Sequence, residues 1–96
     1  MNSADLKAHV QAAANDIRER WQAYVAAVHF GADVPLSVRI ESFVTPAREY
    51  LRQNHPRVDQ APAGTFWTVL VLAVLNSRTH TAEEVNCAIE EIRLRF

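Results

Sequence analysis

The placement of its few helix-breaking residues is the feature that most constrains how this chain folds. The sequence holds only two glycines and four prolines in 96 residues. These six residues are Gly31, Pro35, Pro46, Pro56, Pro62 and Gly64. Because Gly and Pro are the strongest local interruptions of regular structure, they divide the chain into four main segments.

The first segment has the spacing of one long amphipathic helix. Its apolar residues recur at steps of three and four, at Leu6, Val10, Ala13, Ile17, Trp21, Tyr24 and Val28. At about 100° per residue, such steps place them in one stripe. Asn2 or Ser3 is a suitable N-cap residue, and Gly31 suits the position after the helix, where glycine adopts a positive φ without steric penalty. The segment predicts a helix near residues 4–30.

The second segment predicts a helix near residues 35–53 with a proline inside it. Pro35 suits the first turn of a helix. The apolar residues keep one phase on both sides of Pro46, at Leu36, Ile40, Phe43, Val44, Ala47, Tyr50 and Leu51. This continuity favours one helix kinked at Pro46, although Thr45 could cap a separate helix. The stretch from His55 to Gly64 has two prolines and little apolar content, and predicts a long surface loop.

The third segment is apolar at every position from Phe66 to Leu75 except Thr68. Its valines and its length also permit a buried strand. No second strand-like run exists to pair with it, and an unpaired buried strand would leave its backbone groups without hydrogen bonds. We therefore expect a buried central helix near residues 65–76, with Thr65 as its cap and with Leu70 and Val74 at the centre of the core.

The last segment begins with the spacing of a capping box, Thr81 followed three residues later by Glu84. An apolar stripe follows, at Val85, Ala88, Ile89, Ile92 and Phe96. These features predict a helix near residues 82–95. Together the four segments predict an all-α fold: one domain spanning residues 1–96, built as a compact bundle of about four helices with the third helix buried.

Charge and cysteine content indicate the cellular compartment of the protein and which classes of partner it does not attract. Ten Lys and Arg residues against eleven Asp and Glu residues leave a net charge of −1, so no long-range field attracts nucleic acid or an anionic membrane. The longest apolar run is roughly half of the ~20 residues that span a bilayer. The single cysteine, Cys87, cannot form an internal disulfide, and the chain does not open with a secretory signal pattern. We expect a cytoplasmic protein without membrane association.

No residue pattern indicates an enzyme, a cofactor site or a metal site. The sequence has no Gly-x-Ser-x-Gly motif and no glycine cluster that would hold phosphate. His80, Glu83, Glu84 and Cys87 have the spacing of one helical face, which is the best set for a metal. However, His80 precedes the predicted helix and the capping box accounts for Glu84. We therefore expect no catalytic residue, no cofactor and no bound metal.

Surplus apolar surface favours a protein-binding module, a small regulator or inhibitor that acts through an exposed helical face. The reverse side of the first helix carries Ala23, Ala26 and Phe30, and the last helix carries Cys87 and Leu94 one heptad apart. We predict that these five residues contact a protein partner, with a homodimer as the simplest form. The alternative is that the alanines are present only because they are good helix formers.

A DNA-associated regulator is the alternative function. The third helix, the short turn and the last helix resemble a helix-turn-helix unit. The resemblance would place Glu83 and Glu84 against phosphate, which disfavours it. A basic cluster offers a phosphate contact, or pairs with the acidic last helix, at Arg48, Arg52, His55 and Arg57. We expect a protein partner rather than nucleic acid.

Overall fold

A computed structural model of the chain, which describes residues 3–29, 31 and 33–96, shows an all-α fold. The helices are α1 (Ser3–Val28), α2 (Leu36–Asn54), α3 (Pro56–Asp59), α4 (Gly64–Asn76) and α5 (Ala82–Arg93). No strand occurs in the described residues. The predicted all-α bundle with four main helices is confirmed, and each main helix lies within two residues of its predicted bounds at either end.

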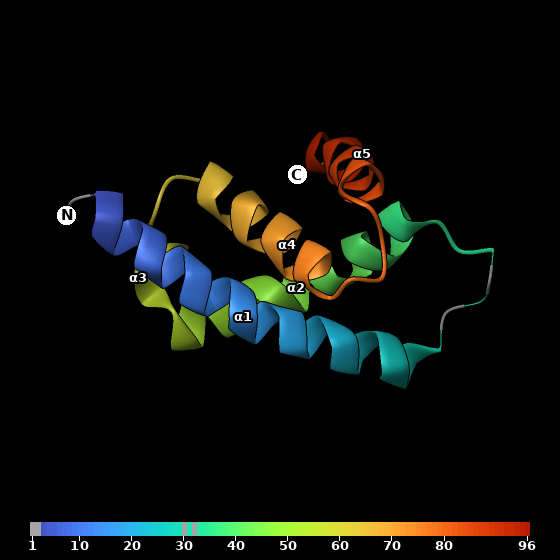
Figure 1. Cartoon of the computed structure of the whole chain (residues 1–96), viewed down its shortest axis with the longest axis horizontal. Helices are drawn as coiled ribbons and strands as arrows, with labels where there is room; N and C mark the ends of the chain where they lie inside the picture. Colours follow the sequence, from blue (N-terminus) through green and yellow to red (C-terminus); the bar gives the residue numbers. More distant parts are fainter. Residues whose placement is uncertain (1–2, 30, 32) are drawn as a thin grey trace.

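Helix α4 lies between α1 and α5 (Figure 1). Its most extensive packing is against α1, which runs along the length of the molecule. Helix α2 packs against α5, and the short α3 connects it back to α1 and α4. The molecule measures 43 × 24 × 23 Å along its principal axes, so its long dimension is close to the length of α1.

One face of each helix supplies the core. Residues whose side chains are fully enclosed come from all four main helices, among them Ile17, Ile40, Val69, Leu70, Val74, Val85 and Ile92. Leu70 and Val74 have no exposed surface, as predicted. Trp21 and Phe43 join α1 to α2 edge to face, with ring centroids 5.3 Å apart. Burial of each such side chain stabilises the fold by roughly 1.5–3 kcal/mol.

Helix α2 continues through Pro46, which confirms one helix in place of two. The proline cannot donate a backbone hydrogen bond to Ser42, four residues earlier. Phe43 and Val44 before the proline and Ala47 after it are buried, and they pack the helix against the core. Packing of one continuous apolar face thus outweighs the lost bond.

The prediction of a long surface loop between α2 and α4 is wrong in part. Residues Pro56–Asp59 form α3, with the proline in its first turn. Val58, the only large apolar residue of this stretch, is 2 % exposed and belongs to the core. A single buried side chain therefore folds the connection into a helical turn.

Two predicted helix ends differ in the structure. Helix α1 ends at Val28, and the residue with a positive φ after it is His29 (φ 52°) rather than Gly31. Helix α4 begins at Gly64, one residue before the predicted cap Thr65, and no side chain caps it. The Thr65 N–H donates instead to the Pro62 carbonyl, at 2.8 Å. For α1, Asn2 lies outside the described residues.

Two residues predicted on core stripes are exposed. Val28 is 44 % exposed, and Phe96 is 59 % exposed. Val28 ends the 26-residue α1, which is twice as long as its main neighbour α4, so the core does not extend to its last turn. Phe96 follows the end of α5, and its ring lies 5.9 Å from that of Trp67.

Candidate functional site

Helix α4 is buried on one side and uncovered on the other. Its core side consists of Phe66, Trp67, Val69, Leu70, Ala73 and Val74. Its opposite side consists of Thr68, Val71, Leu72 and Leu75, of which the threonine is exposed and the others are half-buried. This spacing defines one side of a helix. The third main helix is thus buried on its core side, as predicted, while its neighbours cover the apolar side chains on its other side only in part.

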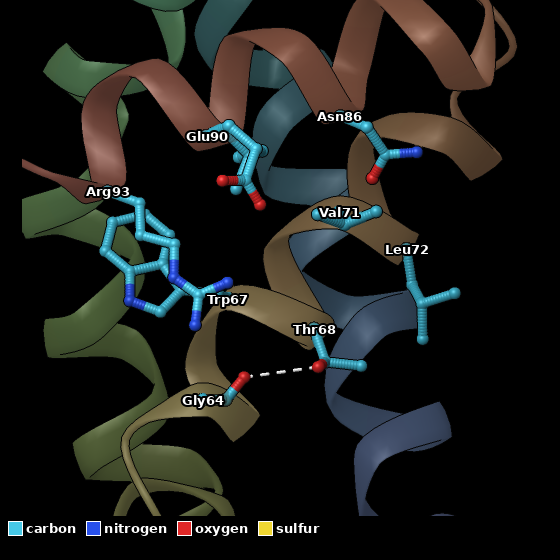
Figure 2. A pocket seen from close by; sticks show the side chains of 9 residues that line it. Gly64, Trp67, Thr68, Val71, Leu72, Asn86, Glu90 and Arg93 are labelled. Carbon is cyan, nitrogen blue, oxygen red and sulfur yellow. Dashed lines mark hydrogen bonds between the residues drawn. The ribbon is translucent and has the colours of Figure 1, made fainter.

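Two neighbouring hollows lie beside this side of α4 and share part of their lining. The first has a volume of about 260 Å³ and lies between α4 and α5, lined by Gly64, Trp67, Thr68, Val71, Leu72, Asn86, Ile89, Glu90 and Arg93 (Figure 2). The second has a volume of about 590 Å³ and lies beside the start of α1, lined by Leu6, Lys7, Val10, Pro62, Gly64, Thr65, Thr68 and Arg93. Gly64, Thr68 and Arg93 line both hollows. We call the combined surface the α4 groove.

The α4 groove has an apolar floor and a polar rim. Figure 2 shows Glu90 and Arg93 reaching from α5 toward α4, with Val71 and Leu72 on α4 beside them. The Thr68 hydroxyl donates to the Gly64 carbonyl at 3.1 Å, so it is partnered within α4. A side chain added at Gly64 would meet no atom within 4 Å, which leaves the start of the groove open.

Two of the four side chains considered for a metal, His80 and Glu84, have other hydrogen-bond partners. Within residues 3–29, 31 and 33–96, no three His, Cys, Asp or Glu side chains are grouped so that they could hold a metal ion. His80 bonds the Thr79 hydroxyl through Nδ1 at 2.9 Å. Glu84 completes the predicted capping box: Thr81 Oγ1 accepts from the Glu84 N–H, and the Glu84 carboxylate accepts from the Thr81 N–H, both at 3.2 Å. The backbone and side-chain hydrogen bonds of Thr81 lower the pKa of Glu84.

The structure describes four of the five predicted partner-binding residues, and all four are exposed. Ala23 and Ala26 are exposed on α1, whereas Cys87 and Leu94 are exposed on α5, Leu94 by 87 %. Phe30 lies outside the described residues. None of the four described residues lines the α4 groove. The groove could not be predicted from the sequence, because an apolar run does not indicate which side of a helix its neighbours leave open. Thr68, the only polar residue between Phe66 and Leu75, lies on that side.

Ala23 does line another hollow, between α1 and α2. It has a volume of about 540 Å³, and its aromatic lining consists of Tyr24, Phe43 and Tyr50. The Arg20 guanidinium lies 3.9 Å from the centroid of the Tyr50 ring, and the Tyr24 hydroxyl donates to Ser42 at 2.8 Å. Contacts between α1 and α2 therefore occupy its main polar groups.

The predicted basic cluster has partners elsewhere in the chain. The Arg48 guanidinium lies over the Phe66 ring, 4.4 Å from its centroid. Arg52 pairs with Glu49, and His55 Nε2 lies 2.6 Å from the Asp16 carboxylate. An ion pair outside the cluster joins α2 to the residues that follow α5, between Glu41 and Arg95 at 2.8 Å. The structure thus gives three of the four basic side chains a partner other than phosphate or the last helix.

None of the described helices is both long enough and apolar enough to cross a membrane. Comparison with known proteins gave no match: no protein-family model, no curated protein and no solved structure is significantly similar to this chain.

Proposed function

We propose that this chain is a protein-binding module that receives an amphipathic helix of a partner protein in the α4 groove. The observation that carries the proposal is the uncovered apolar side of α4, where Val71, Leu72 and Leu75 are half-buried between α1 and α5. A domain of this kind is built from helices that bury their apolar stripes against one another. A partner helix laid along the groove would complete the cover of α4.

The shape of the groove favours a helix over a small ligand. Small-molecule sites enclose most of the surface of their ligand. The α4 groove instead is open and runs along α4 from Gly64 to Leu72, nine residues or about 12 Å of helix. Helix-in-groove recognition uses partner side chains at positions i, i+3, i+4 and i+7. The matching spacing of Thr68, Val71, Leu72 and Leu75 supports this mode.

As the partner-binding surface, we favour the α4 groove over the helical faces predicted from the sequence. The exposed side of α1 around Ala23 and Ala26 offers small side chains, whereas the groove offers larger apolar side chains flanked by α1 and α5. Homodimerisation through these faces stays a secondary proposal. Such a module would regulate or inhibit its partner by covering the bound helix, in the cytoplasm if Cys87, a free thiol, is kept reduced.

A titration with a neutral helical peptide tests the proposal. The probe is a 14-residue peptide with leucines at i, i+3, i+4 and i+7 and glutamines on its other face. We expect it to shift the amide resonances of Thr68, Leu72 and Asn86 in the ¹⁵N-labelled protein.

The variant Thr68→Arg should block this binding by filling the floor of the groove. Thr45→Arg is the matched control, since Thr45 is also an exposed mid-helix threonine but lies on α2 outside the groove. Circular dichroism should show that both variants keep the helical fold. Equal weakening by the two variants, or shifts confined to other surfaces, would contradict the proposal.

A further inference from the structure

We infer that the partner helix is acidic: an amphipathic helix whose apolar stripe is flanked by Glu or Asp side chains. The inference rests on the proposed function and specifies the chemistry of the partner. The observation behind it is the distribution of charge along the two edges of the α4 groove.

The α1 edge of the groove is basic. Lys7 lines the hollow beside the start of α4. At about 100° per residue, the polar residues Gln11, Arg18 and Gln22 lie on the same side of α1 as Lys7, although they line neither hollow. No carboxylate belongs to this set. The Arg18 Nε–H is buried and has no hydrogen-bond acceptor in the part of the chain that the structure describes.

The acidic residues of α1 lie on its other sides. Asp16 is nine residues from Lys7, half a turn out of phase, and it contacts His55 at the end of α2. Glu19 lines the hollow between α1 and α2 together with Asp16. Asp16 and Glu19 thus face α2, together with Arg20, whereas Lys7 lines the groove.

The α5 edge contributes Arg93, which lines both hollows, and Glu90, which lines one. The neutral Asn86 lies between α5 and the groove floor one turn before Glu90. The carboxylate of Glu84 is held in the capping box at the start of α5. Glu90 is thus the only carboxylate among the residues that line the two hollows.

Among the residues that line the groove, Lys7 and Arg93 stand against Glu90, although the whole chain has a net charge of −1. Complementary charge on a partner helix would set its specificity and its association rate. Lys7 and Arg93 line the same hollow beside Gly64. Acidic residues at that end of the partner helix would therefore contribute most to the electrostatic attraction. A basic helix would meet Lys7 and Arg93 at that end, where no carboxylate among the described residues lines the hollow.

Three peptides that share one leucine stripe test the inference. They carry Glu, Gln or Lys at the flanking positions, and their binding to the full chain is measured by fluorescence anisotropy at low and high salt. We expect the Glu peptide to bind about tenfold more tightly than the Lys peptide, because several exposed charge pairs contribute a few tenths of a kcal/mol each. Added salt should remove most of the difference.

The variant Arg93→Glu should weaken binding of the Glu peptide about fivefold and strengthen binding of the Lys peptide. Arg57→Glu is the matched control, because Arg57 is exposed on α3 and lines neither hollow of the groove. It should leave the order of the three peptides unchanged. Equal effects of both variants would overturn the inference, since binding would then follow net charge alone.

The remaining outcomes separate the inference from the proposed function. Binding of the Gln peptide that Thr68→Arg blocks, with no preference for Glu over Lys, keeps the groove as a site and overturns the acidic partner. Absence of binding by all three peptides overturns both. A dimer in sedimentation analysis that Thr68→Arg dissociates assigns the groove to a second copy of the chain, and also overturns the acidic partner.

Discussion

Arg78 ends α4 in a backbone conformation that suits glycine better than arginine. Its φ is 58°, and its N–H donates to the Leu75 carbonyl at 3.0 Å, which closes the last turn of the helix. The left-handed conformation costs an L-residue with a Cβ roughly 1–2 kcal/mol. His29 has the same role after α1, with a φ of 52°. The preference of glycine for such positions could not reveal these two sites, because neither residue is a glycine.

Arg78→Gly should therefore stabilise the protein by about 0.5–1 kcal/mol, since the relief of the left-handed strain exceeds the extra entropy of glycine in the unfolded chain. Arg78→Ala retains the Cβ and removes only the charged side chain. It serves as the control. Urea denaturation measures both variants, and a glycine variant no more stable than the alanine variant would show that the conformation carries no strain.

The capping box at Thr81 and Glu84 predicts a specific dependence of stability on pH. Hydrogen bonds from the Thr81 backbone and side chain lower the pKa of Glu84 below its ordinary value of 4.5. A lowered pKa in the folded state means that the ionised carboxylate stabilises the fold above its unfolded-state pKa. This contribution is lost as the pH falls through the lower pKa of the folded state.

Glu84→Gln should consequently have a lower melting temperature than the parent protein at pH 7, and the difference should shrink as the pH is lowered from about 5 to 3. Thermal unfolding followed by circular dichroism at several pH values gives this difference directly. A difference of the same size at pH 3 and pH 7 would show that the carboxylate is not ionised in the capping box.

Whole helices were more predictable from the sequence than the residues that end them. Periodic apolar residues predicted α1, α2 and α5, because one side of each helix is buried and the other is polar. For α4 the apolar pattern predicted a helix but did not distinguish its two sides, because Leu70 on the core side and Leu72 on the groove side are both apolar. Hydrophobicity shows that a helix has apolar surface, but only the arrangement of α1 and α5 determines which part stays open. The groove was therefore not predictable, and α3 depended on one buried residue, Val58.

The two sides of α4 should respond differently to the same substitution. Leu70→Ala removes a fully enclosed side chain and should cost about 2–5 kcal/mol of stability. Leu72→Ala removes a half-buried side chain from the groove floor and should cost about half as much or less. Chemical denaturation measures the two costs, and equal costs would show that α4 is buried on both sides.

The whole molecule depends on one small core. Helix α4 contacts α1 most extensively and also packs against α5 and α3, so its central side chains connect most of the bundle. Domains of this size have a total stability of about 5–15 kcal/mol. Burial of one unpaired charge at the centre costs several kcal/mol, which is a large fraction of that total stability.

Leu70→Asp and Val74→Asp should each unfold the domain, as shown by loss of the cooperative thermal transition and of helical circular dichroism. Thr68→Asp, which places the same charge on the uncovered side of the same helix, should leave the protein folded. Normal melting of both core variants would mean that α4 lies at the periphery of the fold.

The central claim is that one side of α4 is an open surface that a partner helix covers, and thiol labelling tests it most directly. In a Cys87→Ser background, which removes the exposed native thiol, single cysteines are introduced as Thr68→Cys, Val69→Cys and Thr45→Cys. We expect fast maleimide labelling at positions 68 and 45 and slow labelling at position 69, because Val69 has no exposed surface. The neutral leucine peptide should then slow labelling at position 68 alone. Slow labelling at position 68 without peptide, or a rate there that the peptide leaves unchanged, would contradict it.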